Sequence, residues 1–562
     1  MTQTRTFLII AWLLVAFLLW DAWQKDQVAR VAPPPAASQV EVPIAEISDG
    51  SVPELPAPTP GEHQPETPVA PTAIADSYNG EVVVLANDKL RLTLDARGDS
   101  IVEAQLLDYP NQLKGDTSPV RLLSREPDHF FIAQNGLVGQ PAAPSHEDRM
   151  VAQGGDRILA DTQDSVELPF LWQGPEGVEV ERRYRLQRGS YLVEVVDVIR
   201  NQGGSTWSGN AYHQLVRVAP PVPKGGFTNP ERLSFVGAAW YSPQDKFEKL
   251  KFEKFDPKNP LRLQVSDGWI AMLQHYFVTA VIPQPGETVS FGNATLSNGR
   301  YLVRELGSSL NVQPGTEAST TTRLYLGPKL RSDLEAISPG LGLTLDYGIF
   351  TVIAQPIHWL LSLLHSLIGN WGWAIVLLVV LIKAAMFKLS EAQYRSFARM
   401  RKIQPRLEAL KERFGDDRQK YQAAMMDLYK KEKINPLGGY LPILVQFPVF
   451  LSLYWVLIEA VELRQAPWIL WIQNLSAPDP YVILPAINLV TMWATQKLSP
   501  TPGMDPMQKR MMQAMPLVFG VMFAFFPAGL VLYWTTNGAL GLLQQWLIMR
   551  RHGEPAPAAA AK

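Results

Sequence analysis

The chain shows three hydropathy patterns in succession, and each predicts a different kind of structure. Continuous apolar runs occur at residues 7–20 and again beyond residue 350, as in membrane-spanning helices. Between them, apolar and polar residues alternate with a period of two, as in residues 90–95 and 178–186. Turn sequences rich in Gly and Asn separate these runs, so residues 76–330 are predicted to form an antiparallel β-sandwich.

The first apolar run is predicted to be an uncleaved signal anchor. A cleaved signal peptide is the alternative, because residues 7–20 are few for a membrane span. The residues that follow, Trp20-Asp21-Ala22-Trp23, are bulky and charged and offer no small-x-small cleavage site. We therefore assign residues 1–23 to a transmembrane anchor. Residues 24–75 are rich in Pro and Ala and poor in aromatics, which predicts a disordered linker.

The apolar runs beyond residue 350 predict a helical membrane core, so the fold class is an α+β membrane protein. Residues 331–368 are expected to contain connecting and interfacial helices, and residues 369–549 five transmembrane helices. Two of the five runs reach only roughly 21–24 Å as helices, against about 30 Å of hydrocarbon. Either their polar flanks extend these helices or the bilayer thins around them. The five runs are residues 374–389, 437–461, 481–494, 511–526 and 529–549.

A helical hairpin is predicted at residues 392–434, between the first two spans of the core. Pro405 is expected to kink its first arm or to begin a new helix. Residues 388–433 contain thirteen Lys or Arg against seven Asp or Glu, which places them in the cytoplasm. Both termini, including a tail at residues 550–562, are then cytoplasmic, and the sandwich is periplasmic. The expected apolar seam of the hairpin is Phe397, Met400, Ile403, Leu407, Leu410, Phe414, Tyr421, Met425 and Leu428.

Composition excludes several kinds of chemistry. The 562 residues carry a net charge of −2 and no cysteine, which argues against sequence-specific nucleic-acid binding and excludes disulfides and thiolate metal sites. Asp164, Glu167 and Glu194 are interpreted as solvated strand positions rather than a glycosidase pair. His358 and His365 lack a third ligand nearby and are interpreted as polar tips at the membrane interface rather than a metal site. No cofactor is expected, since no phosphate-cradling glycine loop is present.

Lys383 carries the strongest functional signal, because it lies within an apolar run. A lysine at the centre of a membrane helix costs roughly 2.5–3.5 kcal/mol unless it faces water or a partner. Snorkelling toward Lys388 and the interface is the alternative. The run continues with Phe387 and Leu389, so the charge is expected at least one turn inside. Glu459 lies near the outer end of its span, which leaves Lys383 without an obvious counter-ion and suited to a visiting anion.

Other polar residues occur at helical depth in the remaining spans. Individually, each is most often a hydrogen-bonding contact between helices. Together with Lys383 they could line a wet cavity. They are Gln446, Ser452, Asn488, Thr491, Thr495, Thr535, Thr536 and Asn537.

Several motifs give the chain a specific resemblance. Asn435-Pro436-Leu437-Gly438-Gly439, Gln446-Phe447-Pro448, Glu462-Leu463-Arg464-Gln465-Ala466-Pro467 and Phe526-Pro527-Ala528-Gly529-Leu530-Val531-Leu532-Tyr533-Trp534 are similar to those of the YidC/Oxa/Alb family of membrane protein insertases. The anchor, the large β domain and Asp346-Tyr347-Gly348 resemble its Gram-negative branch. The resemblance covers essentially the whole chain.

This resemblance implies an insertase and chaperone, not an enzyme, that acts alone or with the Sec translocon through a hydrophilic groove open to cytoplasm and lipid. It implies nascent membrane proteins as partners, with ribosome and anionic lipid near the hairpin and tail, and a mutarotase-like supersandwich in the periplasm. The family's groove cation, usually arginine, falls on Lys383. The expected substrate-binding groove is Lys383, Gln446, Phe447, Pro448, Phe450, Phe519, Trp534 and Asn537.

Three other function classes fit less well. A secondary transporter should show repeated halves and paired titratable residues at the midplane, whereas this core is unrepeated. An intramembrane hydrolase should show a His-Glu-x-x-His motif or a nucleophile elbow, and neither is found in the sequence. A structural scaffold would explain the β domain but not Lys383.

Overall fold

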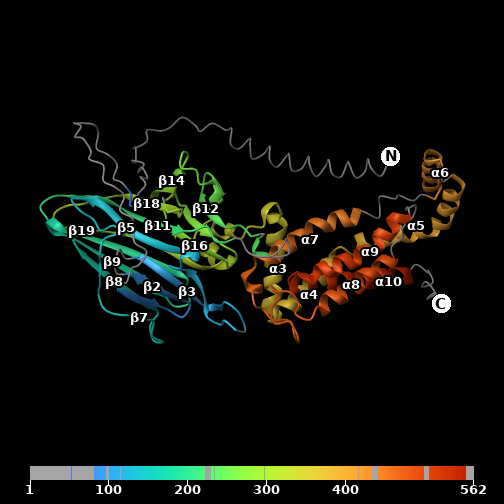
Figure 1. Cartoon of the computed structure of the whole chain (residues 1–562), viewed down its shortest axis with the longest axis horizontal. Coiled ribbons are helices and arrows are strands. Elements are labelled where there is room, and N and C mark those ends of the chain that lie inside the picture. The colour runs from blue at the N-terminus through green and yellow to red at the C-terminus, as the bar shows by residue number, and fades with distance from the viewer. Residues whose placement is uncertain are drawn as a thin grey trace. The chain divides into compact units, whose positions relative to one another are not determined.

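The computed structural model describes residues 52–53 and 81–551, except 96–99, 114, 222–229, 233, 297, 415–416, 433–440 and 499–505 (Figure 1). The predicted anchor, nearly all of the linker and the tail beyond Arg551 lie outside the described residues. The described residues belong to one compact unit, which contains both a β-rich part and a helical part.

Two β-sheets form the middle of the chain, as the period-two pattern predicted. Their inner faces share one hydrophobic core, and the described pairings are antiparallel except for β1 with β7. In spatial order, the first sheet contains β14 (Arg262–Ser266), β17 (Thr288–Thr295), β18 (Tyr301–Val312), β11 (Trp207–Arg217), β5 (Phe131–Gln140), β3 (Ser100–Pro110), β2 (Leu90–Asp95), β1 (Val82–Ala86) and β7 (Arg157–Ile158), with β4 (Pro119–Leu123) on β3. The second contains β13 (Lys246–Leu250), β12 (Gly237–Ser242), β15 (Trp269–Leu273), β16 (Phe277–Ile282), β19 (Thr316–Pro328), β10 (Leu192–Asn201), β9 (Val178–Gln187), β8 (Ser165–Gln173) and β6 (Val151–Ala152).

Strand β9 shows how the sequence produces this core. Every second residue from Val178 to Leu186 is buried, because successive side chains of a strand point to opposite faces. Arg182 falls in this inward register and is fully buried. Its Nε donates to Oδ1 of Asp197 on β10 at 2.6 Å, and Nη2 approaches Oδ2 at 3.2 Å. On the outward face, Arg185 approaches both Glu167 and Glu194, which supports their interpretation as surface strand positions.

The described residues after β19 are mostly helical (Figure 1). Helix α10 packs against α8, α4 and α5, and α3 packs against α4 and α7. The helices are α2 (Arg331–Ile337), α3 (Thr351–Ile368), α4 (Trp371–Ala385), α5 (Phe387–Phe414), α6 (Arg418–Lys431), α7 (Leu441–Glu459), α8 (Ile483–Leu498), α9 (Pro506–Phe523) and α10 (Ala528–Arg551).

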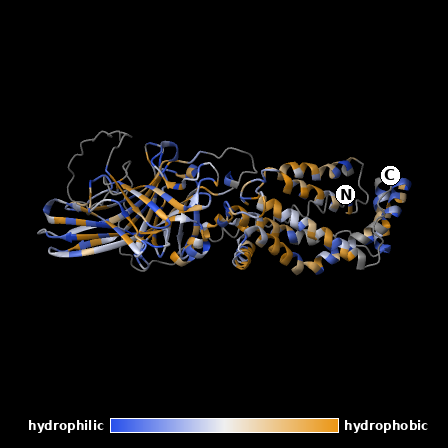
Figure 2. Cartoon of the chain, turned by 90° about the horizontal axis from the view of Figure 1, so that it is seen from below, coloured by the Kyte–Doolittle hydropathy of each residue, from blue (hydrophilic) through white to orange (hydrophobic). Residues whose placement is uncertain are grey.

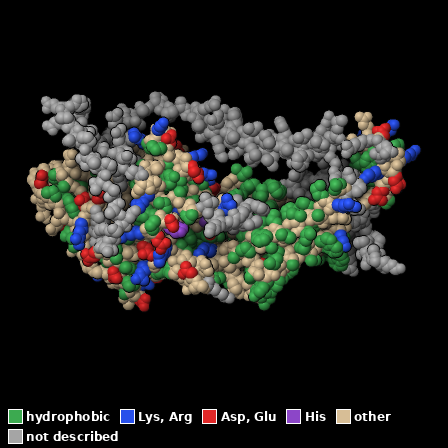
Figure 3. All heavy atoms as spheres, viewed as in Figure 1, with side chains coloured by type: hydrophobic (Ala, Val, Ile, Leu, Met, Phe, Trp, Pro, Cys, Tyr) green, Lys and Arg blue, Asp and Glu red, His purple; other side chains and the backbone are tan. Residues whose placement is uncertain are grey.

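The helical part is largely hydrophobic in colour, whereas hydrophobic and hydrophilic positions alternate along the strands (Figure 2). Many large apolar side chains of the helices are exposed. Figure 3 shows these apolar side chains covering much of the visible face of the helical part. Among the described helices, Gly348–Ile368 is the one that is long and apolar enough by itself to cross a membrane, and α4 with α5 qualifies only as a bent pair. The interfacial role of α3 stays a prediction. Exposed examples are Val352, Trp359, Leu367, Val490, Trp493, Met511, Leu517, Val518, Val521, Phe525 and Trp546.

The first predicted core span is not a straight helix. Helix α4 ends at Ala385, and α5 begins at Phe387 after a bend of 66°. Met386 leaves the helical conformation at φ −91° and ψ 11°, while its N–H still bonds to the carbonyls of Ile382 and Ala384. The expectation that the helix continues through Phe387 was therefore wrong, and Lys383 lies in the last turn of α4.

Helices α5 and α6 pack against each other as the predicted hairpin requires, and of the two outcomes expected at Pro405, a new helix does not begin there. Helix α5 continues through Pro405 to Phe414, and α6 follows. Part of the predicted seam is confirmed, since Met400, Ile403 and Leu407 of α5 form a buried cluster with Tyr429, against which Met425 and Leu428 of α6 pack.

The two histidines of α3 occupy different surroundings. His358 is buried rather than at an interface, because it lies on the inner side of α3, with its Nε2 3.6 Å from Oε1 of Glu462. The ring of His365 stacks on Trp371 with centroids 3.9 Å apart. Within the described residues, no group of three or more His, Cys, Asp or Glu is placed to hold a metal ion.

Candidate functional site

The side chain of Lys383 points from α4 toward α10 and α5. A Cβ built on Gly541 of α10 would lie 3.9 Å from Lys383 Nζ and 3.5 Å from the hydroxyl of Tyr394. That hydroxyl donates to the Gly541 carbonyl at 3.1 Å, and Gln544 Nε2 donates to the Lys383 carbonyl at 3.3 Å. Lys383 is 9% exposed, and no carboxylate in the described part of the chain lies within 4.0 Å of its ammonium group. Lys383 is thus a nearly buried cation surrounded by neutral polar groups.

One face of α10 connects this cation to the other predicted polar residues. Trp534, Asn537, Gly541 and Gln544 follow one another at intervals of three and four residues, which places them along one side of the helix. Gln446 Nε2 of α7 donates to Oδ1 of Asn537 at 2.9 Å. The stripe therefore joins α7 to α4 across α10, and it places the predicted Lys383, Gln446 and Asn537 on the same side of α10.

The predicted apolar residues gather at the Trp534 end of this stripe. The ring of Phe450 lies 4.6 Å from that of Trp534, which in turn lies 5.4 Å from Phe523. Phe519 stacks on Phe523 at 6.2 Å. Three helices, α7, α9 and α10, thereby contribute to one aromatic cluster.

Two predicted residues of α7 lie beside this cluster. The ring of Phe447 is 52% exposed and 6.4 Å from that of Phe450. Pro448 lies inside α7, and its carbonyl accepts a hydrogen bond from Ser452 Oγ at 2.7 Å. The aromatic cluster therefore presents one ring at its outer edge while the remaining rings pack between helices.

Several other polar residues bond within their own helices. Thr491 Oγ1 donates to the Asn488 carbonyl, Thr495 Oγ1 to the Thr491 carbonyl, and Thr535 Oγ1 to the Val531 carbonyl. Such bonds satisfy a hydroxyl locally and require no cavity. These three threonines are thus accounted for by helix structure.

An ion pair that the sequence did not reveal lies between the sandwich and α7. Lys329 follows β19, and its Nζ is 3.7 Å from Oε2 of Glu459, with both side chains about 2% exposed. Burial lowers the pKa of the Lys329 ammonium, and the negative charge of Glu459 opposes that shift.

Two hydrogen bonds also join the sandwich to the helical core. His275 bonds through Nε2 to the Ile458 carbonyl at 3.1 Å, and Gln465 donates to the Pro110 carbonyl at 2.9 Å. The sandwich and helical core are therefore joined by buried polar contacts.

The bond between Gln446 and Asn537 gives a first prediction. Replacing Gln446 by Leu should destabilise the chain by about 1–3 kcal/mol, because the Asn537 oxygen then loses its donor in a partly buried position. Thermal unfolding in detergent measures the loss. Adding Asn537→Leu should recover part of it, since both polar groups are then removed. If the loss of stability in the double variant exceeds the sum of the losses in the two single variants, this pairing is contradicted.

Comparison with protein families matches both parts of the chain. Residues 82–360 match the family described as YidC periplasmic domain, and residues 363–555 match the 60Kd inner membrane protein family. A membrane protein insertase YidC of Xanthomonas campestris pv. campestris is 48% identical over 569 residues, which cover 99% of this chain and 98% of the relative. The chain belongs to the YidC family of membrane protein insertases. A YidC of Stenotrophomonas maltophilia is 46% identical over 576 residues, which cover 100% of this chain and 99% of that relative.

Among solved structures, an active YidC insertase with its first transmembrane domain resolved aligns over 84% of this chain and 93% of its own. Its TM-score is 0.39 at 17% identity. A galactose mutarotase related enzyme from Lactobacillus acidophilus aligns over 44% of this chain and 97% of its own, with a TM-score of 0.30 at 11% identity. Because both TM-scores lie below 0.5, neither alignment bears on the fold or the function of this YidC-family chain.

Proposed function

We propose that this chain inserts integral membrane proteins into the bacterial inner membrane and assists their folding. The observation that carries the proposal is the nearly buried Lys383 beside a polar stripe that leads to an aromatic cluster. Family membership supports it, since relatives that match over nearly the full length are named insertases. The polar stripe forms a hydrophilic path, and the aromatic cluster guides an emerging helix toward lipid.

Electrostatic attraction is the proposed first step. A client's translocating tail that carries Asp or Glu meets Lys383, which has no carboxylate within 4.0 Å in the described part of the chain. At about 4 Å, opposite unit charges attract by about 4 kcal/mol in a partly shielded site. The lysine ammonium group is a compact charge, whereas the planar guanidinium of arginine can bond both oxygens of a carboxylate. Binding to Lys383 should therefore require positive charge but not bidentate geometry.

The client's hydrophobic segment supplies the drive for insertion. As the tail crosses, the apolar segment passes Phe447, Phe450, Phe519 and Trp534 and partitions into lipid, which gains about 25 cal/mol for each Å² of apolar surface buried. The membrane potential acts on the charges of the tail. No nucleotide hydrolysis is required in this scheme.

The proposed topology has six transmembrane spans, with both termini in the cytoplasm. The anchor provides the first span. The α4–α5 segment, α7, α8, α9 and α10 provide the others, with α3 against the membrane. Helix α8 contains 16 residues, which at about 1.5 Å each gives about 24 Å of helix, and this supports a thinned bilayer beside the stripe. The sandwich then faces the periplasm, and the α5–α6 hairpin faces the cytoplasm.

The hairpin is the proposed receiving surface. Its buried seam of Met400, Ile403 and Leu407 leaves basic side chains outside, and such a surface beside a membrane attracts anionic lipid and ribosomal RNA. The Sec translocon is a further proposed partner for larger clients.

Reconstitution tests the function. The purified chain in proteoliposomes should insert a small client with an acidic tail, so that the tail becomes protected from added protease. Liposomes without the chain provide the background. Insertion no greater than that background would overturn the proposal, because a transporter, a hydrolase and a scaffold all predict no insertion.

Gly541 gives a second prediction. Replacing it by Leu should lower the insertion rate several-fold, because even a single Cβ there lies 3.9 Å from Lys383 Nζ and a larger side chain displaces the ammonium group. Gly538→Leu on the same helix is not a suitable control, since its Cβ meets Thr491 at 3.0 Å. Leu543→Ala, at an exposed site on α10, is the better control and should leave insertion unchanged. Wild-type insertion by Gly541→Leu would contradict a role for space around Lys383.

A further inference from the structure

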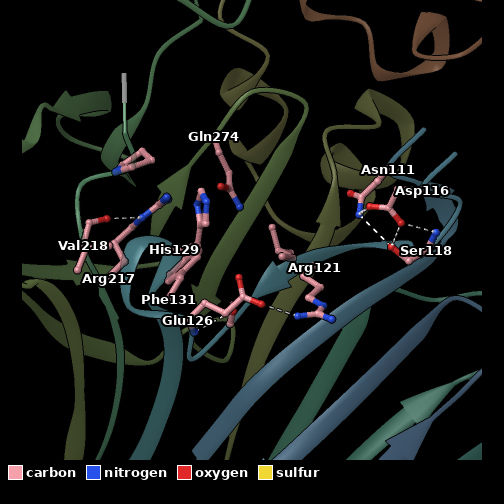
Figure 4. A pocket seen from close by; sticks show the side chains of 13 residues that line it. Asn111, Asp116, Ser118, Arg121, Glu126, His129, Phe131, Arg217, Val218 and Gln274 are labelled. Carbon is pink, nitrogen blue, oxygen red and sulfur yellow. Dashed lines mark hydrogen bonds and ion pairs between the residues drawn. The ribbon is translucent and has the colours of Figure 1, made fainter. Parts of the chain in front are cut away.

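The sandwich contains a polar pocket that the proposed insertion mechanism does not use. Its volume is about 450 Å³, within the range of about 300–1,000 Å³ typical of ligand sites. Residues from the β3–β4 connection, the start of β5, the end of β11 and the β15–β16 turn surround it (Figure 4). Among the lining side chains are Asn111, Arg121, Glu126, His129, Arg217 and Gln274.

Arg217 lines this pocket although its side chain is almost fully buried. It is the last residue of β11 and only 5% exposed, and within the described residues no carboxylate lies within 4.0 Å of its guanidinium. Its Nε donates to the Val218 carbonyl at 3.3 Å, and its buried Nη1 has no hydrogen-bond acceptor. The guanidinium lies over the rings of Phe131 and Phe252, at 4.5 and 5.7 Å.

A buried cation of this kind is costly for the fold. Burial lowers the pKa of Arg217 to about 10, so the group stays charged at neutral pH without an anion to offset its desolvation. Rings beneath a cation recover only part of that cost. An anion in the pocket would recover more, because it supplies both the missing charge and an acceptor.

The rest of the lining limits the charge of that anion. Arg121 already pairs with Glu126 at 2.7 Å and with Glu103 at 3.4 Å. Asp116 also lines the pocket, and hydrogen bonds from Ser118 lower the pKa of its carboxyl. Because Glu103 and Glu126 already pair with Arg121, Arg217 is the one lining guanidinium left to meet an anion, and it supplies a single positive charge. The pocket is therefore suited to a singly charged carboxylate rather than to a phosphate.

We propose that this pocket binds an acidic stretch of polypeptide, with one Asp or Glu carboxylate held by Arg217. The Gln274 amide, the side-chain oxygen of Asn111 and the hydroxyl proton of Ser124 are left to bond neighbouring peptide groups. The amide nitrogen of Asn111 and the Ser118 hydroxyl already bond to Asp116. The carbonyl of Asn111 accepts hydrogen bonds from Gln465 and Arg464, both in the loop after α7. One wall of the pocket is thus attached to the helical core, where a segment leaving that core would pass.

Equilibrium binding to the full chain in detergent tests this site. The probe is a labelled pentapeptide, acetyl-Ala-Ala-Asp-Ala-Ala-amide, in which the side chain is the only carboxylate, and its partner carries Asn in place of Asp. Wild type should bind the Asp peptide at least tenfold more tightly than the Asn peptide. Arg217→Gln should abolish that difference.

Two further variants complete the design. Arg300→Gln is the matched control, since Arg300 also lies over a ring, at 3.7 Å from Phe130, but does not line the pocket, and it should bind as wild type. Gln274→Trp keeps Arg217 and fills the pocket, so it should weaken binding at least tenfold even if Arg217→Gln fails to fold.

Three results would overturn the proposal. They are equal affinity of wild type for the two peptides, wild-type binding by Gln274→Trp, and displacement of the peptide by succinate at the peptide's own affinity. The last would assign the pocket to small organic acids. Because this assay involves no membrane insertion, its failure leaves the proposed insertase function to be judged separately.

Discussion

Replacing Lys383 by Glu should reduce insertion of an acidic-tailed client at least tenfold. The substitution converts the attraction of about 4 kcal/mol at about 4 Å into a repulsion of similar size. Even a fraction of that change exceeds the 1.4 kcal/mol or so that corresponds to a factor of ten. The protease-protection assay in proteoliposomes measures the rate, with the amount of reconstituted protein held equal.

Companion variants separate charge from shape at this position. Lys383→Arg should retain most of the activity, and Lys383→Ala should fall between wild type and Lys383→Glu. Lys258→Glu on the exposed surface of the sandwich makes the same change in net charge and should insert normally. Full insertion by Lys383→Glu would exclude the electrostatic role while leaving open whether the chain is an insertase.

Replacing Lys329 by Ala should lower the stability of the folded chain by about 3–5 kcal/mol, because it leaves the buried Glu459 carboxyl without its cation. Thermal unfolding of the full chain in detergent should show a lower midpoint. The double variant Lys329→Met with Glu459→Leu should recover most of the loss, since well-packed apolar residues often replace a buried ion pair without cost.

A surface ion pair in the same region provides the control. Lys249 contacts Asp346, and its side chain is 35% exposed. Such pairs contribute at most about 1 kcal/mol, so Lys249→Ala should leave the midpoint almost unchanged. If Lys329→Ala and Lys249→Ala lower the unfolding midpoint equally, the buried Lys329–Glu459 pair stabilises the fold no more than a surface pair does.

The sequence predicted the sandwich well because its signal is local. Alternation in residues 178–186 identifies strand β9 and its inner face without knowledge of any partner. The same register places Arg182 inside, so its need for a buried anion could have been recognised, although Asp197 could not have been named. Lys329 and Glu459 lie 130 residues apart in the sequence, and no local pattern connects them.

Helix boundaries were less predictable than helix existence. Apolar composition continues across Met386, so hydropathy predicted one span where the backbone bends by 66°. At Pro405 the residue suggested a kink or a new helix, and no new helix begins there. At both positions, local sequence preference alone did not fix the helix boundary.

The candidate site was predicted partly from residues and partly from resemblance. Lys383 was distinctive by itself, and Gln446 and Asn537 were visible as polar residues in apolar runs. Phe447, Phe450, Phe519 and Trp534 came only from the family motifs, since aromatic residues in membrane helices are common. Tyr394 and Gly541 were missed, because they matter only through a contact across 147 residues of sequence.

The end of α4 at Ala385 has an electrostatic consequence for Lys383. Aligned peptide dipoles give the C-terminus of a helix about half a negative charge, which stabilises a cation in the last turn by about 0.3–1 kcal/mol. Lys383 lies in that turn, so it is stabilised by the macrodipole of its own helix. A straight helix through residue 389 would have moved that negative end beyond Lys383. The bend thus places a weak favourable dipole beside the cation, and because the dipole is weaker than a carboxylate, it does not prevent an arriving acidic tail from binding.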